Sequence, residues 1–378
     1  MTRTPESALG VGRPQRILRG LASMLALIVG LSGCATPSAL TIEKPCPEGW
    51  AAAVLWSSET AGRSEVAFVG ESGVVEQRSW PFQGLGAAPN ALTRSGADVW
   101  MVANGNTIRD RTDVLRFTTA SCALRSWRVP EQAVWSVAET QGGFVTTDAL
   151  NGAAHLHRRD REGRLVAENV VEGISLTTLV AADDQLLALG NYWGGTDEGL
   201  LLELDPVSLA VKRRIDLSPL MSTGPQAVSV GGVLYFPITT ATGEDGGEHE
   251  GRTLVAVSLR DLSAKRVPLD SPAPYLMAGT GDSLFVGHTF INPGFREMSE
   301  YRFVSRYDLR TGGVETFEVG GPLRSIAVAG SSLAVLTGDS DAVMVKTYDA
   351  ASMKLISSLE VPRPSGSGYF YPAGLIVR

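Results

Sequence analysis

Short apolar runs separated by turn residues recur along most of this chain. After residue 50 no long stretch carries apolar residues at helical spacing; a run rich in Val, Ile, Leu or Ala is followed by Gly, Asp or Asn and then by another run. Residues 225–236 and 323–336 both read as strand, tight turn and strand. The 42 glycines fit a chain with many turns. The pattern predicts an all-β protein made of antiparallel hairpins.

The hairpins come in pairs, which gives a repeating unit of four strands every ~40–50 residues. Six complete units fit the sequence, at 88–129, 131–171, 174–217, 222–270, 273–320 and 321–362. Three more strands are predicted near 51–57, 64–70 and 74–79, and a single one at 372–378. If that last strand completes the first unit, the chain forms a closed seven-bladed β-propeller, with four antiparallel strands in each blade and no free sheet edge at the seam.

Two aspartates mark equivalent turns of this repeat. Asp308 and Asp349 lie 41 residues apart, each directly after a predicted third strand. An aspartate at this place accepts hydrogen bonds from backbone N–H groups two residues further on. We therefore assign both acids a structural role rather than a catalytic one.

The repeat resembles those of bacterial surface propellers, including the lactonase-like and quinoprotein-like groups. The resemblance depends on the strand–turn periodicity and on turns such as Asp308 to Gly312. The tryptophan-docking signature of quinoprotein repeats and a Trp-Asp repeat ending are absent. The resemblance implies the fold and leaves the function open.

The N-terminal segment has the pattern of a secretory signal. Arg13, Arg16 and Arg19 precede an apolar stretch from Leu21 to Leu31, which is too short to span a bilayer as a helix. Leu-Ser-Gly-Cys, ending at Cys34, resembles the lipobox of bacterial lipoproteins. The alternative is an ordinary signal peptide with a chance cysteine.

The lipobox resemblance implies that residues 1–33 are removed and that Cys34 carries acyl chains such as palmitate. We accordingly expect a signal peptide at 1–33, a lipidated tether at 34–49 and a propeller at 50–378. Ala35, rather than Asp, follows the cysteine, a pattern associated in Gram-negative lipoproteins with export to the outer membrane. The expected location is therefore the cell envelope, with the membrane as one partner through Cys34.

Charge narrows the range of further partners. Removing residues 1–33 takes away four basic residues and one acid, so the formal net charge goes from −7 to −10. An acidic surface argues against nucleic acid as a partner. We expect a monomer without a cofactor, and a protein or an envelope ligand as the binding partner.

Besides Cys34, the mature chain contains two cysteines, Cys46 and Cys122. In an oxidising compartment they can form a disulfide or remain two separate thiols. The sequence leaves both alternatives open, because it does not show how closely their Cα atoms approach.

Long connections between second and third strands suggest a binding face. They occur in three consecutive blades, at 190–198, 239–252 and 289–302, and such connections share one face of a propeller. The side chains that we expect there are Tyr192, Trp193, Asp197, Glu244, Asp245, His249, Phe290 and Arg296. Exposed aromatic pairs favour recognition. The alternative is that these are solvated insertions; the acids around Glu244 lack the spacing of an EF-hand calcium loop.

The remaining candidate chemistry is weaker. His155 and His157 share one face of a predicted strand, as two metal ligands would, but no third ligand is nearby, so a surface strand is the favoured interpretation. No Gly-x-Ser-x-Gly elbow, Walker loop or Cys-x-x-Cys pair occurs, and no catalytic residue or metal site is assigned. We predict a binding scaffold. The alternative is a lactonase-like propeller hydrolase or lyase with a metal in the central channel, which needs carboxylates, Asn or His converging at the channel mouth.

Overall fold

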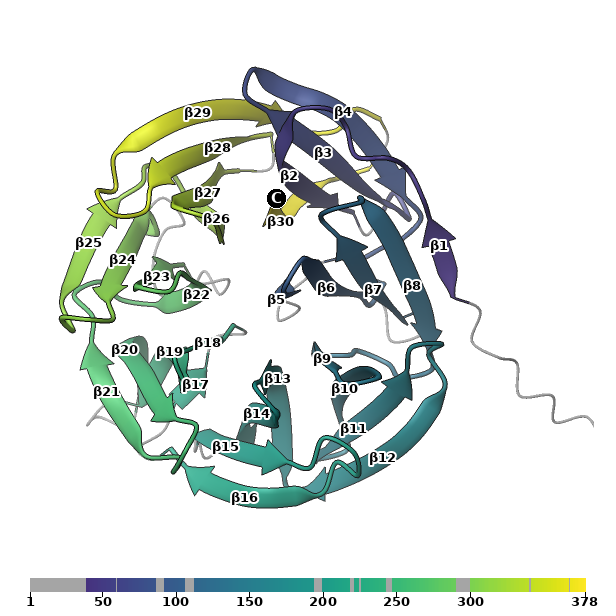
Figure 1. The fold of residues 1–378 in the computed structure, drawn as a ribbon, viewed down its shortest axis with the longest axis vertical. Helices are drawn as coiled ribbons and strands as arrows, with labels where there is room; N and C mark the ends of the chain where they lie inside the picture. The colour runs from purple at the N-terminus through teal and green to yellow at the C-terminus, as the bar shows by residue number, and fades with distance from the viewer. Residues whose placement is uncertain are drawn as a thin grey trace, which may run out of the picture. The chain divides into compact units, whose positions relative to one another are not determined.

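Seven antiparallel sheets stand around a common axis (Figure 1). This arrangement comes from a computed structural model, which describes residues 39–58, 60–85, 92–105, 112–193, 199–217, 221–223, 226–242, 247–289, 300–339, 341–366 and 368–378. The regular elements of these residues are β-strands. The same residues include no helix long and apolar enough to cross a membrane. The predicted seven-bladed propeller is confirmed.

The strand bounds agree closely with the predicted units. Blade 1 contains β30 (Tyr371–Val377), β2 (Trp50–Ser57), β3 (Ser64–Gly70) and β4 (Gly73–Trp80). Blade 2 contains β5 (Thr93–Ser95), β6 (Asp98–Ala103), β7 (Thr112–Thr118) and β8 (Ala123–Val129). Blade 3 contains β9 (Ser136–Thr140), β10 (Gly143–Leu150), β11 (Ala153–Asp160) and β12 (Leu165–Glu172). Blade 4 contains β13 (Ile174–Ala182), β14 (Gln185–Tyr192), β15 (Gly199–Leu204) and β16 (Val211–Asp216).

The other three blades follow the same order from the axis outward. Blade 5 contains β17 (Met221–Thr223) and β18 (Val228–Val230), which both pair with β19 (Val233–Thr242), then β20 (Glu248–Ser258) and β21 (Ala264–Pro268). Blade 6 contains β22 (Pro274–Gly279), β23 (Ser283–His288), β24 (Phe303–Asp308) and β25 (Val314–Glu318). Blade 7 contains β26 (Leu323–Ala329), β27 (Ser332–Gly338), β28 (Ala342–Asp349) and β29 (Leu355–Pro362).

The C-terminal strand closes the ring. β30 pairs antiparallel with β2, with Val54 opposite Leu375 and Ala52 opposite Val377. The innermost strand of blade 1 thus comes from the end of the chain and its other three strands come from the beginning. Leu375 and Val377 are buried, so closure also completes part of the core.

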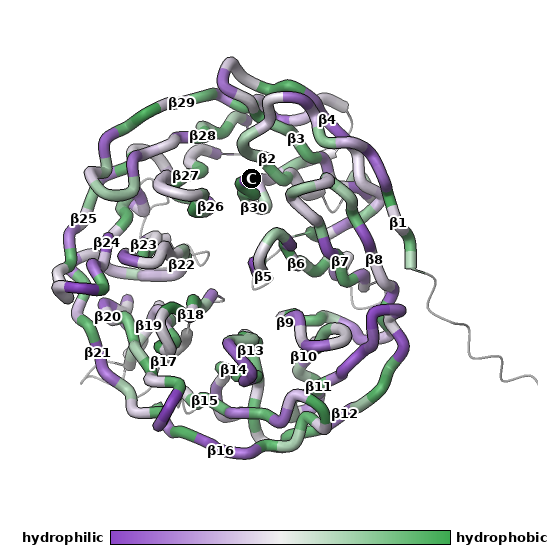
Figure 2. The backbone as a smooth tube through the Cα atoms, viewed as in Figure 1, coloured by the Kyte–Doolittle hydropathy of each residue, from purple (hydrophilic) through white to green (hydrophobic). Residues whose placement is uncertain are grey.

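The core consists of seven hydrophobic clusters, and each joins two neighbouring blades. Figure 2, coloured by hydropathy, shows that every blade contains both hydrophobic and hydrophilic residues. Between blades 2 and 3, for example, Trp100, Trp127 and Phe144 pack with ring centroids 5.1–5.5 Å apart. Because every sheet buries both faces against its neighbours, removing one strand weakens two clusters at once.

A five-residue turn joins the third and fourth strands of several blades. The N–H of Gly312 donates to the Asp308 carbonyl and that of Met353 to the Asp349 carbonyl, and both donors have a positive φ. Asp308 Oδ1 also accepts hydrogen bonds from the backbone N–H groups of Arg310 and Thr311. These bonds lower the pKa of the Asp308 carboxyl. The structural role predicted for these aspartates is confirmed.

The segment before blade 1 is held on the propeller rather than extended as a free tether. β1 (Leu40–Ile42) adds a fifth strand to blade 2 by pairing with β8. Cys46 and Cys122 form a disulfide with Cα atoms 5.0 Å apart, and Arg78 Nη2 donates to the Pro45 carbonyl over 2.6 Å. Within the range expected to be the tether, Leu40–Ile42 and Cys46 thus contact blade 2. A disulfide that closes a loop of this size contributes roughly 2–4 kcal/mol.

His288 illustrates how a polar group is accommodated in the core. It is 1% exposed at the end of β23, where Nδ1 lies 2.8 Å from the Pro272 carbonyl oxygen and Nε2 lies 2.7 Å from Ser305 Oγ. A carbonyl only accepts, so Nδ1 carries the proton and Nε2 accepts from the hydroxyl of Ser305. Burial lowers the pKa of His288 from 6.5 to about 4. The residue is a satisfied structural histidine.

This depressed pKa predicts a stability loss in mild acid. The unfolded chain binds the proton near pH 6.5 and the folded chain near pH 4, so stability falls as the pH drops through that window. The contribution of this group is on the order of 3 kcal/mol. Urea denaturation at several pH values should show a steeper loss for the wild type than for His288→Gln, whose amide carries a donor and an acceptor but does not titrate. Equal pH dependence in the two proteins would contradict the assignment.

Candidate functional site

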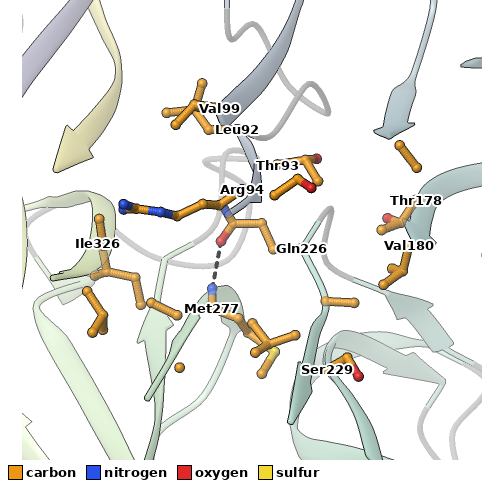
Figure 3. A pocket seen from close by; sticks show the side chains of 18 of the residues that line it. Leu92, Thr93, Arg94, Val99, Thr178, Val180, Gln226, Ser229, Met277 and Ile326 are labelled. Carbon is orange, nitrogen blue, oxygen red and sulfur yellow. Dashed lines mark hydrogen bonds between the residues drawn. The ribbon is translucent and has the colours of Figure 1, made fainter. Parts of the chain in front are cut away.

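The seven inner strands enclose a central cavity of about 500 Å³ (Figure 3). Its wall is composed of aliphatic, small and hydroxyl-bearing residues from all seven blades. Only two of the residues that line it are charged, Arg94 on β5 and Glu139 on β9. Neither residue was predicted from the sequence, because residues from different blades meet at the axis whatever their separation in the chain.

Several polar groups in the channel have a structural task. Gln226 Oε1 accepts a hydrogen bond from the Met277 backbone N–H over 2.6 Å, which links blade 5 to blade 6 (Figure 3). Ser325 Oγ accepts from the Leu375 N–H over 3.2 Å and links blade 7 to blade 1. These bonds join neighbouring blades at the channel wall. They leave Arg94 as the polar channel residue with the most unused donors.

Arg94 spans the junction between blades 1 and 2. Its Nε donates to the Gly96 carbonyl over 3.2 Å and its Nη1 donates to the Val377 carbonyl over 3.1 Å. Water can reach the side chain from the channel, yet the surrounding protein lowers the pKa of Arg94. An arginine has five N–H donors, so this one retains three for other acceptors.

Glu139 is fixed from the neighbouring blade. Its Oε2 accepts a hydrogen bond from Trp100 Nε1 over 3.2 Å, and the Trp100 ring is stacked on Trp127 with centroids 5.5 Å apart. The carboxylate is therefore hydrogen-bonded to the aromatic cluster between blades 2 and 3.

The channel provides little of what a metal-dependent hydrolase needs. Glu139 is the one carboxylate among the residues that line the cavity, which include no His or Asn. In the part of the chain that the structure describes, no group of three or more His, Cys, Asp or Glu is arranged to hold a metal ion. These residues have no convergent acid–base set to support the hydrolase alternative.

The second strands of the blades end, and the third strands begin, on one face of the propeller, which we call the loop face. Tyr192, the last residue of β14, is fixed there because its hydroxyl donates to Asp216 Oδ1 over 2.8 Å. This hydrogen bond raises the pKa of Tyr192. The Arg214 guanidinium lies 5.7 Å from the centre of the Tyr192 ring. Asp216 and Arg214 thus hold the tyrosine in one orientation.

Trp193 follows Tyr192 and is 54% exposed. Its backbone N–H donates to the Gly173 carbonyl over 2.8 Å. Its indole lies against the β10–β11 turn of blade 3, where a Cβ added at Gly152 would be 3.4 Å from Trp193 Cδ1. The indole therefore rests on a glycine turn with its other side in solvent, as an aromatic anchor for a partner would.

The other predicted loop-face residues are only partly described. His249 is exposed and lies on β20 opposite Ala241, because the hairpin continues to Thr242 and Glu248. The prediction of one long loop over 239–252 was wrong, since most of that segment is paired strand. Five further candidates lie outside the described residues: Asp197, Glu244, Asp245, Phe290 and Arg296.

The histidine pair of β11 has different surroundings from those expected. The rings of His155 and His157 share one face, 6.4 Å apart and nearly parallel. His157, however, is not on an open surface: Nδ1 lies 3.3 Å from Glu131 Oε1 and Nε2 lies 3.5 Å from Asp148 Oδ2. Glu131 is also ion-paired with Arg159. The two acids flank opposite sides of the imidazole, so they do not converge on one metal position.

Comparisons with known proteins show the fold and no more. No family model matches the sequence, and no curated protein matches it. Among solved structures, a putative 6-phosphogluconolactonase from Bacteroides fragilis is 14% identical, with a TM-score of 0.58 over 88% of this chain and 99% of that one. A second, from Bacteroides uniformis, is 12% identical, with a TM-score of 0.57 over 87% and 99%. A Synechocystis apocarotenoid oxygenase is 11% identical, with a TM-score of 0.52 over 90% and 96%.

Proteins with such different activities share this architecture, so the likeness does not transfer an activity to this chain. It does agree with the expected lactonase-like propeller fold.

Proposed function

We propose that this protein is a lipoprotein of the cell envelope, anchored by acyl chains on Cys34, whose propeller binds a protein or an envelope ligand on its loop face. The observation that carries the proposal is the Tyr192–Trp193 pair. One ring is fixed by Asp216 and Arg214, and the other rests on Gly152 while 54% exposed. A rigid aromatic surface binds with a small loss of side-chain entropy.

Two further features support binding rather than catalysis. The described channel lining has a single carboxylate, and the loop face stands on a ring whose ends are paired, which gives its connections a rigid base. The lipobox-like sequence that ends at Cys34 supports membrane anchoring through that cysteine.

A pull-down from chemically crosslinked envelopes tests the proposal. Trp193→Ser should reduce recovery of the partner by roughly 30-fold, the effect of losing an interface anchor worth about 2 kcal/mol. Its melting temperature should match the wild type, since the indole packs on the surface. Asp184→Ser, in the β13–β14 turn at the opposite end of the same blade, is the matched control. Equal recovery with all three proteins would refute the loop face as the binding surface.

A further inference from the structure

Arg94 and Glu139 occupy equivalent places in neighbouring blades. Each is the penultimate residue of its inner strand, next to the turn that leads into the second strand. The penultimate residues of the other inner strands are uncharged: Ala181, Ser229, Ala278, Val328 and Ile376. The channel therefore has one positive and one negative side chain, at one level and on adjacent strands.

These opposite charges are not paired with each other. Within the described residues neither side chain takes part in an ion pair; Arg94 donates to two backbone carbonyls and Glu139 accepts from the Trp100 indole. Both are held by neutral partners on their own sides of the channel. The positions of the two charges are thus set independently of a ligand.

A ligand with matching charges gains in this environment. The protein around Arg94 disfavours its charged form, so the guanidinium is incompletely solvated and gains from a negative partner. Arginine N–H groups bind carboxylates through strong charge-assisted hydrogen bonds, and a carboxylate binds an ammonium group in the same way. The remaining wall is neutral, with hydroxyls from residues such as Thr93 and Ser229.

From this we infer that the channel binds a small zwitterion, an amino acid or a short peptide, with its carboxylate on Arg94 and its ammonium group on Glu139. The cavity of about 500 Å³ is large enough for such a molecule. The site lies near the turns that join first and second strands, at the opposite end of the channel from the loop face. The inference extends the proposed binding function to a second surface, and either can fail without the other.

Calorimetry on the detergent-solubilised full-length protein tests this with three probes at constant ionic strength: diglycine, acetate and methylammonium. Diglycine should bind at least tenfold more tightly than either singly charged probe. Glu139→Gln should weaken diglycine binding tenfold or more while its amide oxygen still accepts from Trp100. Arg94→Gln should do the same, and Glu315→Gln, an exposed acid on β25, should have no effect.

Nitrogen-15 labelling of tryptophan gives a second measurement. The chain has seven tryptophans, and the Trp100 indole N–H, which donates to Glu139, should shift as diglycine is added. No diglycine binding, or acetate binding as tight as diglycine binding, would overturn the inference. If Arg94→Gln does not fold, Glu139→Gln alone decides the matter. Equal partner recovery with the wild type, Trp193→Ser and Asp184→Ser, together with normal diglycine binding, would instead refute the proposed function alone.

Discussion

Deletion of residues 372–378 is expected to abolish folding. The deletion removes nearly all of β30 and exposes the pairing edge of β2. It also removes Leu375, Ile376 and Val377, all no more than 3% exposed, and each such side chain contributes ~1.5–3 kcal/mol. With the lost backbone hydrogen bonds, the sum is comparable to the whole stability of a typical domain, about 5–15 kcal/mol.

Thermal unfolding followed by circular dichroism checks this expectation. The truncated protein should show no cooperative transition, whereas Arg378→Ala, which leaves β30 intact, should melt close to the wild type. A truncated protein with an unchanged melting curve would refute closure by the C-terminal strand.

Replacement of Cys34 by Ala is expected to release the protein from the membrane. A single acyl chain binds a bilayer only reversibly and several chains bind it firmly, so losing the acylated cysteine should move nearly all of the protein to the soluble fraction. Ultracentrifugation of lysed cells and immunoblotting of both fractions measures this. The double replacement Cys46→Ala/Cys122→Ala removes the disulfide but leaves the lipobox, so it should remain in the pellet. Retention of Cys34→Ala in the pellet would contradict the anchor.

The blades were predictable because the repeat is local. Alternating apolar runs, glycine turns and equivalent acids such as Asp308 and Asp349 recur at a steady interval, and each unit must bury both sheet faces against its neighbours. The incomplete first unit and the single last strand then required a closed ring, which the β2–β30 pairing shows.

Features that depend on distant contacts were not predictable. β1 has only three residues and forms because β8 offers an edge. The β19–β20 hairpin extends beyond Thr239 although Gly and Glu dominate that segment. Pairs such as Ala241 and His249 form because they continue the hydrogen-bonded ladder of the preceding residues of β19 and β20. His157 meets Glu131 and Asp148 from separate segments, so no sequence spacing indicates their contact.

The candidate site shows the same division. The exposed Trp193 could be found from a long connection after a strand, because its place depends on one blade. Arg94 and Glu139 belong to different blades and become neighbours only when the inner strands are aligned at the axis. An alignment of the repeats on the turn between their first and second strands would have placed Arg94 and Glu139 at equivalent positions of neighbouring blades.

Site-specific photo-crosslinking in living cells tests the central claim, binding through the loop face, most directly. A photoreactive amino acid is placed at position 193 or, as the control, at position 184 in the turn at the opposite end of blade 4. We predict a discrete crosslinked species from position 193 that is absent from position 184. Identical patterns from the two positions, or no crosslinked species from position 193, would contradict the account.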